Sequence, residues 1–161
     1  MNRLFVITLL LCGFLAASAA AQSTVFIVRH AEKAAGNGDD PDLSQVGQAR
    51  AESLANILKE VGITAIYATE FKRTQETAAP LAKTIGVGVA KVPGKSTAEL
   101  VTKLQDLKGG NALVVGHSNT IPPLIKALGV DAPINISEND YDNLFVVTLD
   151  KKPRLLRLRF R

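Results

Sequence analysis

The sequence predicts an α/β fold, a three-layer sandwich in which a mostly parallel central sheet of about five to six strands is flanked by helices. Short apolar and β-branched runs alternate along the chain with segments of helical spacing, as in strands joined by crossover helices. Beyond the first 21 residues, about 140 remain, the size of one domain with its own core. No internal repeat, low-complexity segment or interdomain linker divides them.

Six strands are expected. Thr24–Val28 and Ala112–Val115 consist of apolar or β-branched residues throughout, as buried strands do. The other strands are expected at Ala65–Ala68, Val87–Val92, Leu144–Leu149 and Leu155–Phe160.

Four helices are expected between these strands. Ser44 is a suitable N-cap for a helix that reaches about Glu60. Thr69 can cap a second helix, which runs through Arg73 and is kinked or restarted at Pro80. The third and fourth helices are expected over Thr97–Leu107, from its leucine spacing, and near Pro122–Leu128.

The first 21 residues have the pattern of a secretory signal peptide. Arg3 supplies a positive charge, Leu4–Leu15 form an apolar stretch too short to span a bilayer, and Ser18–Ala21 offer small residues for cleavage. We therefore expect a signal peptide over residues 1–21 and a single exported domain, periplasmic or secreted, over residues 22–161. Lipidation at Cys12 is the alternative, but the bulky Leu11 stands where that signal has a small residue.

Cys12 is the only cysteine, so the exported domain would contain none. Its core would hold it together without disulfides, although the expected compartment permits them. A cysteine nucleophile and cysteine metal ligands are excluded, and no second apolar segment is long enough to span a membrane.

The basic residues are concentrated at the C-terminus. The last eleven residues, KKPRLLRLRFR, contain six basic and no acidic residues, whereas Gln22–Asp150 contain 12 basic and 15 acidic ones. Arginines alternate there with Leu156, Leu158 and Phe160, which predicts a charged edge strand with one face buried. Attraction to an anionic lipid surface or a phosphorylated substrate is the alternative. Few aromatic residues are interleaved with the charges, so nucleic-acid binding is not expected.

The chain has two histidines, and both directly follow a predicted buried strand. Arg29 and His30 end the first strand, Arg73 follows the second, and His117 follows the fourth. Ligands of open α/β sheets bind beyond the carboxyl ends of the strands, where these side chains would meet. A packed, hydrogen-bonded role is the ordinary explanation for one such histidine, but two equivalent positions favour a functional site.

Two arginines and two imidazoles suit an anion, above all phosphate, whose oxygens the planar guanidinium matches in pairs. A metal is the rival ligand for paired histidines, and it would need a third ligand. The candidates are Glu32, Asp39, Asp40 and Asp42. Arg29 beside a cation would be unfavourable, so we expect no metal and no other cofactor.

Four segments of the chain resemble the histidine phosphatase superfamily, the phosphoglycerate-mutase-like proteins. VRHAE (Val28–Glu32) is similar to the Arg-His-Gly signature of that family. YATEFKRTQETA (Tyr67–Ala78) is similar to its Ser-x-x-x-Arg segment followed by Thr-Ala, with Thr69 where serine is common. VVGHSNT (Val114–Thr120) looks like the segment of the second histidine, and LSQVGQARA (Leu43–Ala51) like the helix after the first loop. In this order they resemble the small single-domain branch without cap insertions.

The resemblance implies a phosphatase that needs no cofactor. His30 would be the nucleophile that becomes a phosphohistidine, and water would hydrolyse this intermediate. Arg29, Arg73 and His117 would bind the phosphoryl oxygens. Ala31 stands where glycine is usual and adds a methyl close to the phosphate, a change that we expect the site to tolerate.

The resemblance does not identify a general acid. Ser118 stands where the acid-phosphatase branch has aspartate, so that branch does not fit. The mutase branch takes a glutamate from the segment before the second histidine, where Glu99 is the candidate, although the first turn of a helix also accounts for a carboxylate there. Glu32, Ser118 and Asn119 are candidate substrate contacts.

About 40 residues separate Arg73 from His117, too few for a cap, so we expect an open site. The expected partner is a phosphorylated small molecule, a phosphoprotein or an envelope sugar phosphate. Two alternatives belong to other classes. One is a non-catalytic phosphate-binding or envelope-interaction domain, and the other is a small metallohydrolase that uses His30 and His117.

Overall fold

The structure is a computed structural model that describes residues 22–36 and 38–161. The predicted signal peptide and Cys12 lie outside these residues. The elements follow one another in the order β1 (Ser23–Arg29), α1 (Gln45–Leu58), β2 (Ile63–Ala68), α2 (Lys72–Ile85), β3 (Val89–Lys91), α3 (Thr97–Gln105), β4 (Asn111–Gly116), α4 (Ile121–Ala127), β5 (Asn143–Leu149) and β6 (Arg154–Arg159).

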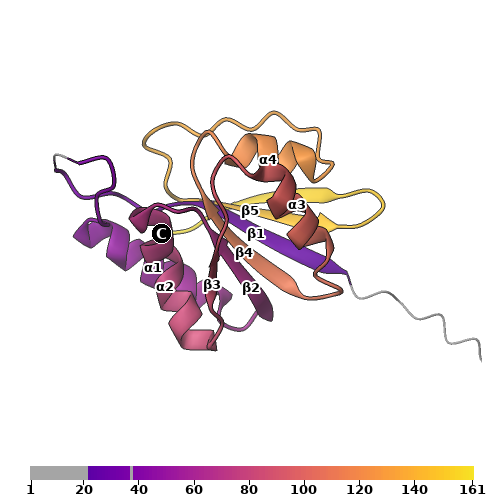
Figure 1. The fold of residues 1–161 in the computed structure, drawn as a ribbon, viewed down its shortest axis with the longest axis horizontal. Helices are drawn as coiled ribbons and strands as arrows, with labels where there is room; N and C mark the ends of the chain where they lie inside the picture. The colour runs from indigo at the N-terminus through magenta and orange to yellow at the C-terminus, as the bar shows by residue number, and fades with distance from the viewer. Residues whose placement is uncertain (1–21, 37) are drawn as a thin grey trace, which may run out of the picture.

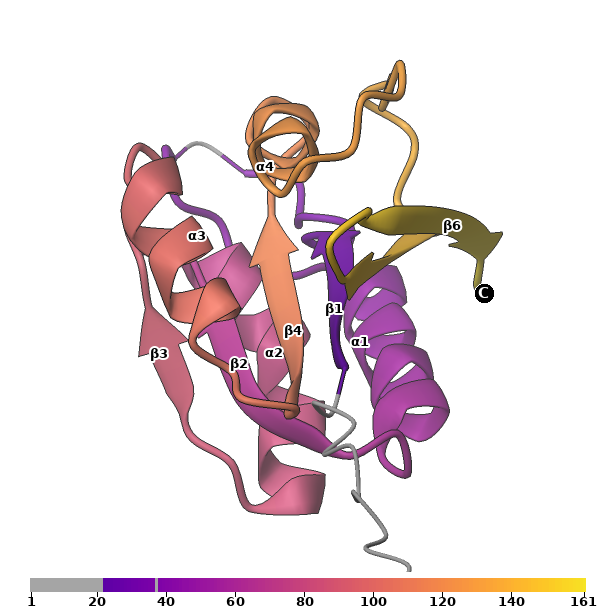
Figure 2. The same cartoon turned by 90° about the vertical axis from the view of Figure 1, so that its right-hand side faces the viewer.

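All six strands form one sheet in the order β3-β2-β4-β1-β5-β6. The four strands β3, β2, β4 and β1 are parallel to one another, β5 runs antiparallel to β1, and β6 antiparallel to β5. Figures 1 and 2 show the sheet between two helical layers. The predicted mostly parallel α/β sandwich is confirmed.

Two apolar clusters hold the layers together, one on each face of the sheet. Leu104, Ile121 and Ile125 bring α3 and α4 against one face, where Ile27 and Phe145 are fully buried. On the other face, Leu54 and Leu58 of α1 and Leu81 of α2 pack against Val28 and Leu113. Neighbouring strand residues alternate between the clusters because strand side chains point to alternate faces.

Helix α2 differs from the prediction at its start, and it does not restart at Pro80. It begins at Lys72 after Phe71, not at a cap formed by Thr69, whose side chain bonds Thr74 and His117 instead. It continues through Pro80 without a break. Buried residues on both sides of Pro80 pack against the sheet, and this tertiary packing overrides the local cost of a proline inside a helix.

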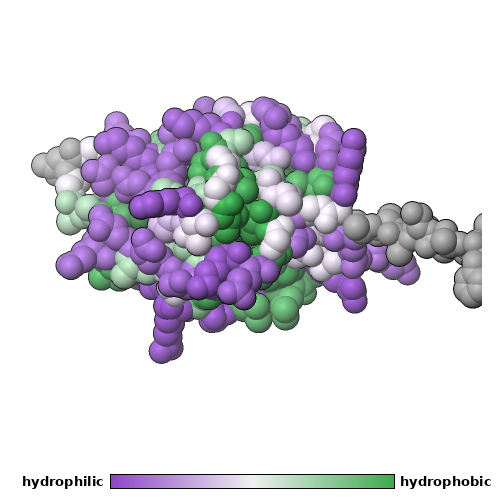
Figure 3. All heavy atoms as spheres, turned by 90° about the horizontal axis from the view of Figure 1, so that it is seen from below, coloured by the Kyte–Doolittle hydropathy of each residue, from purple (hydrophilic) through white to green (hydrophobic). Residues whose placement is uncertain are grey.

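The C-terminal segment forms the predicted edge strand, but the expected burial of one face is wrong. Leu156 is 56% exposed and Leu158 is 42% exposed, because β6 is the outermost strand of the sheet. Only Phe160, just beyond the strand, is buried. On the face drawn in Figure 3, hydrophobic side chains gather near the middle and along the lower edge, among hydrophilic ones. In the described ranges, no helix is both long and apolar enough to cross a membrane.

Phe160 anchors the end of the chain, and its replacement by alanine is predicted to destabilise the fold by about 3 kcal/mol. The ring belongs to the cluster under α1 and α2, and the Arg50 guanidinium lies 5.9 Å from its centre. Urea denaturation measures the change, with Leu156→Ala as an exposed control on the same segment. Equal, small losses in both variants would contradict this anchoring role.

Candidate active site

The four predicted catalytic residues meet in one cleft at the carboxyl ends of three neighbouring strands. Arg29 is the last residue of β1 and His30 follows it, His117 follows β4, and Arg73 lies in the first turn of α2, beyond β2. All four line the cleft, together with Ser118 and Asn119. The parallel order β2-β4-β1 produces this convergence, because it places the three strand ends at one edge of the sheet.

His30 is buried, and its ring is held in one tautomer. Nδ1 lies 2.8 Å from the Ala31 carbonyl oxygen. A carbonyl can only accept, so Nδ1 carries the proton and Nε2 keeps its lone pair. Burial lowers the pKa of His30 to about 4, and the nearby cations act in the same direction, although the Ala31 carbonyl opposes the shift. His30 is therefore neutral at pH 7, with Nε2 able to act as a nucleophile.

His117 lies beside His30, with 5.2 Å between the ring centres. Its Nε2 is 2.9 Å from the Thr69 hydroxyl, which also lies 2.9 Å from the Thr74 hydroxyl. Burial, with Arg73 as the next cause, lowers the pKa of His117 to about 4. Thr69 is therefore the residue that orients the second imidazole.

Arg29 is 4% exposed and held by the loop before β5. Nη1 donates to the carbonyls of Ser137 and Glu138, Nη2 donates to the Glu138 carboxylate, and the Tyr141 ring lies 4.4 Å from the guanidinium carbon. Within the described residues, buried Nε has no hydrogen-bond partner. An unmatched donor at the cleft is suited to receive an anion.

Arg73 approaches the cleft from α2. Its guanidinium carbon lies 4.4 Å from the centre of the Phe71 ring, and Nη1 is 3.6 Å from the Asp40 carboxylate. Asp40 also accepts a hydrogen bond from the Lys72 backbone N–H at 2.9 Å. The same carboxylate therefore both caps α2 and holds the Arg73 side chain in place. The Phe71 ring also meets the His117 ring edge to face, with 5.3 Å between the centres.

Helices α1 and α2 pack against the segment that follows His30 and fix its position. The Ala31 backbone N–H donates to Thr77 on α2 at 2.9 Å. The Ala31 methyl packs in a buried cluster with Leu43 and Ala51, so it does not enter the cleft. Gly47 of α1 lets the helix approach: a Cβ there would lie 2.2 Å from the Glu32 carbonyl oxygen. This packing keeps the methyl group out of the cleft, which is consistent with the expected tolerance of alanine after His30.

The structure places two predicted site residues elsewhere. The Glu32 carboxylate binds Arg50, with its nearest contact at 2.6 Å, and does not line the cleft. Glu99 stands in the first turn of α3, 3.5 Å from Lys103, and is also outside the cleft. Glu99 as a general acid is therefore not supported, because the helix places its carboxylate on a solvent-facing turn.

Other carboxylates line the cleft, and sequence analysis did not single out two of them. Glu70 accepts a hydrogen bond from the Gly94 backbone at 3.0 Å, and backbone hydrogen bonds lower its pKa. The Arg29 guanidinium is the main cause that lowers the pKa of Glu138. Asp39 lines the cleft as well. Glu70 lies inside the segment YATEFKRTQETA (Tyr67–Ala78), whereas Glu138 comes from a loop without a recognisable pattern.

The potential metal ligands of the described residues do not form a cluster in the cleft. Across residues 22–36 and 38–161, no group of three His, Cys, Asp or Glu side chains is placed to hold a metal ion. Asp40 and Asp42, two proposed third ligands, instead accept from Lys72. The chemistry of this donor set, two arginines with two neutral imidazoles, fits an oxyanion better than a cation.

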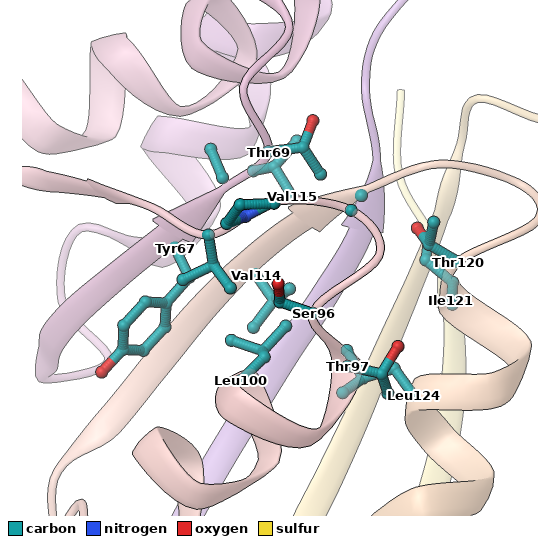
Figure 4. Close-up of a pocket in the computed structure, with 15 residues that line it drawn as sticks. Tyr67, Thr69, Ser96, Thr97, Leu100, Val114, Val115, Thr120, Ile121 and Leu124 are labelled. Carbon is teal, nitrogen blue, oxygen red and sulfur yellow. The ribbon is translucent and has the colours of Figure 1, made fainter.

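A smaller apolar pocket adjoins the cleft between the sheet and helices α3 and α4 (Figure 4). Gly94 and Thr120 line both spaces, and Thr69 lines the apolar pocket. Thr69 bonds the His117 ring, and the Thr120 hydroxyl accepts the His117 backbone N–H at 2.9 Å. The residues that orient His117 thus also separate the polar cleft from apolar space.

The rate constant kcat/KM of any reaction that starts at Nε2 is predicted to fall as the pH drops through about 4. Protonation of His30 removes its lone pair, and the adjacent His117 titrates in the same range, so the two act as a pair. A pH–rate profile, corrected for ionisation of a phosphate ester near about pH 6, measures this. A fall centred near 6.5, the ordinary value for histidine, would contradict the burial argument.

Comparison with known proteins agrees with this geometry. Residues 25–100 match the family model described as histidine phosphatase superfamily, branch 1. No curated protein sequence matches the chain. Solved structures share the fold at low sequence identity.

Three of these structures illustrate the range. A complex of the protein histidine phosphatase SixA with tungstate is 21% identical, with a TM-score of 0.68, over 84% of this chain and 96% of that one. A putative alpha-ribazole-5'-P phosphatase from Escherichia coli is 14% identical, with a TM-score of 0.68, over 85% and 96%. A mycobacterial glucosyl-3-phosphoglycerate phosphatase with inorganic phosphate is 16% identical, with a TM-score of 0.65, over 83% and 95%.

Proposed function

The chain belongs to the histidine phosphatase superfamily, and on that premise we propose that it is an exported phosphatase that forms a phosphohistidine on His30. The observation that supports this most directly is the neutral His30 ring, with a free Nε2, in the same cleft as Arg29, Arg73 and His117. The proposed substrates are phosphomonoesters or phosphoramidates.

The reaction would proceed in two displacements. Nε2 of His30 attacks phosphorus, a P–N bond forms, and the bond from phosphorus to the leaving group breaks. Water then attacks the phosphohistidine, the P–N bond breaks, and inorganic phosphate and neutral His30 are regenerated. Arg29, Arg73 and His117 would hold the phosphoryl oxygens through both steps and balance their charge. The His30 Nδ1–H, fixed on the Ala31 carbonyl, would stabilise the positive charge that develops on the ring.

The carboxylates in the cleft favour substrates with good leaving groups. A general acid needs a proton at working pH, which requires a raised pKa. Glu70 and Glu138 have lowered pKa values and are ionised. The nitrogen of a phosphoramidate can already carry a proton when it leaves phosphorus, and the leaving group of an aryl phosphate is a weakly basic phenolate. Either would react without a proton from these two side chains.

Export and the natural partner rest on different grounds. The proposed signal peptide would place the domain in a periplasm or outside the cell. The segment between Arg73 and His117 is too short to form a cap over the cleft. An open cleft suits a phosphoprotein, an envelope sugar phosphate or a phosphorylated small molecule. The basic edge strand β6 could add weak contact with an anionic surface.

Hydrolysis of an aryl phosphate by the purified protein in the presence of a chelator tests the proposal. We expect turnover that the chelator leaves intact and that His30→Ala removes. Loss of turnover with chelator would instead favour a metallohydrolase. Phosphate binding without turnover of either an aryl phosphate or a phosphoramidate would favour a non-catalytic binding domain.

A further inference from the structure

Arg29 is paired with an exposed carboxylate from its own chain. Nη2 of Arg29 lies 3.0 Å from Oε2 of Glu138. The Arg29 side chain is 4% exposed, whereas the Glu138 side chain is 82% exposed. A carboxylate that can swing into solvent thus occupies one arm of a buried guanidinium.

The Glu138 carboxylate sits where an oxyanion would also bind. It lines the same cleft as His30 and His117. Its second oxygen accepts a hydrogen bond from Ser118 Oγ at 3.3 Å, so it links Arg29 to the segment after His117. The phosphoryl group proposed above would use the same two sides of the cleft.

A phosphate and this carboxylate compete for the same donors. Nη1 of Arg29 is taken by the carbonyls of Ser137 and Glu138, so Nε and Nη2 are the donors left for a ligand. Nη2 is the donor that the Glu138 carboxylate holds. Two anions at one guanidinium arm repel each other, so phosphate binding requires the carboxylate to move away.

The corresponding pair at Arg73 is built differently. Its carboxylate, Asp40, also caps α2 through the Lys72 backbone and is less exposed, at 37%. Asp40 therefore has a structural role that fixes its position. Glu138 has only Arg29 and Ser118 as side-chain partners among the described residues, which leaves it free to exchange with a ligand.

We propose that Glu138 is a built-in competing anion for Arg29 that weakens the binding of phosphate and so promotes release of the product. This inference rests on the proposed function, since it concerns the same phosphate site. The ligands with which Glu138 competes for Arg29 are tetrahedral oxyanions such as phosphate. By returning to Arg29 after hydrolysis, Glu138 replaces the phosphate as the partner of the guanidinium.

Calorimetric titration with inorganic phosphate tests this without turnover. For Glu138→Gln we expect the dissociation constant to fall about fivefold, the factor expected if the carboxylate occupies Arg29 for about four-fifths of the time. Glu138→Asp keeps the charge but shortens the reach, and its constant should lie in between. Glu52→Gln, an exposed carboxylate on α1, is the matched control and should leave the constant unchanged.

The kinetics give a second readout. In Glu138→Gln we expect a lower KM for an aryl phosphate and stronger inhibition by phosphate, with kcat lowered by no more than the factor by which phosphate binding tightens, because release of phosphate is the only step that slows. An equal or higher dissociation constant for phosphate would overturn the proposal. A fall in kcat with unchanged phosphate binding would also overturn it, because Glu138 would then only position Arg29. Phosphate binding by a protein without turnover would contradict the proposed function but leave this comparison valid.

Discussion

Replacing His30 by alanine should lower kcat by at least about a thousandfold, the scale seen when a nucleophile is removed. In the proposed reaction, this side chain makes the covalent bond to phosphorus, and the cleft offers no equivalent: the other imidazole, His117, has Nε2 engaged by Thr69. Steady-state hydrolysis of an aryl phosphate measures the effect.

The control for His30→Ala is phosphate binding. Arg29 and Arg73 remain in the variant, so it should fold and still bind inorganic phosphate. Circular dichroism and calorimetry check both points. Full activity in a folded His30→Ala protein would contradict the phosphohistidine mechanism.

Replacing Arg73 by alanine should lower kcat/KM by about a hundredfold to a thousandfold, the range for loss of one charged donor in a transition state. The variant loses the guanidinium that α2 directs into the cleft, while Asp40 and the α2 cap remain. Arg73→Lys should recover only part of the loss, because an ammonium cannot bind two oxygens in the planar fork.

Lys83→Ala is the matched control for Arg73→Ala. Lys83 is an exposed cation in the last turn of the same helix, so its removal changes the net charge equally without touching the cleft. The same steady-state assay compares the two. Equal effects in both variants would show that Arg73 acts through long-range charge rather than contact.

The sequence predicted the part of the site that lies at strand ends. Runs of buried strand residues are recognisable, and Arg29, His30 and His117 follow them directly, so parallel topology alone brings them together. Arg73 could be assigned to the site only from the spacing of its segment. Its helix, α2, begins at Lys72 and not at the cap that Thr69 suggested.

The parts that sequence did not predict depend on long-range contacts. Glu138 and Tyr141 belong to a loop far from Arg29 along the chain, and only the fold places them against its guanidinium. The exposure of Leu156 depends on where the helical layer ends, which periodicity does not encode. Glu99 lay in the expected interval, but the turn of α3 determines which way it faces.

The most direct test of the mechanism is to trap the intermediate. The protein is mixed with a radiolabelled aryl phosphate or phosphoramidate, quenched in alkali within milliseconds and digested for mass spectrometry. We predict a phosphoryl group on the peptide that contains His30, stable in alkali and lost in acid, as a P–N bond is. Turnover without any labelled protein, or an acid-stable label on another residue, would contradict the proposed mechanism.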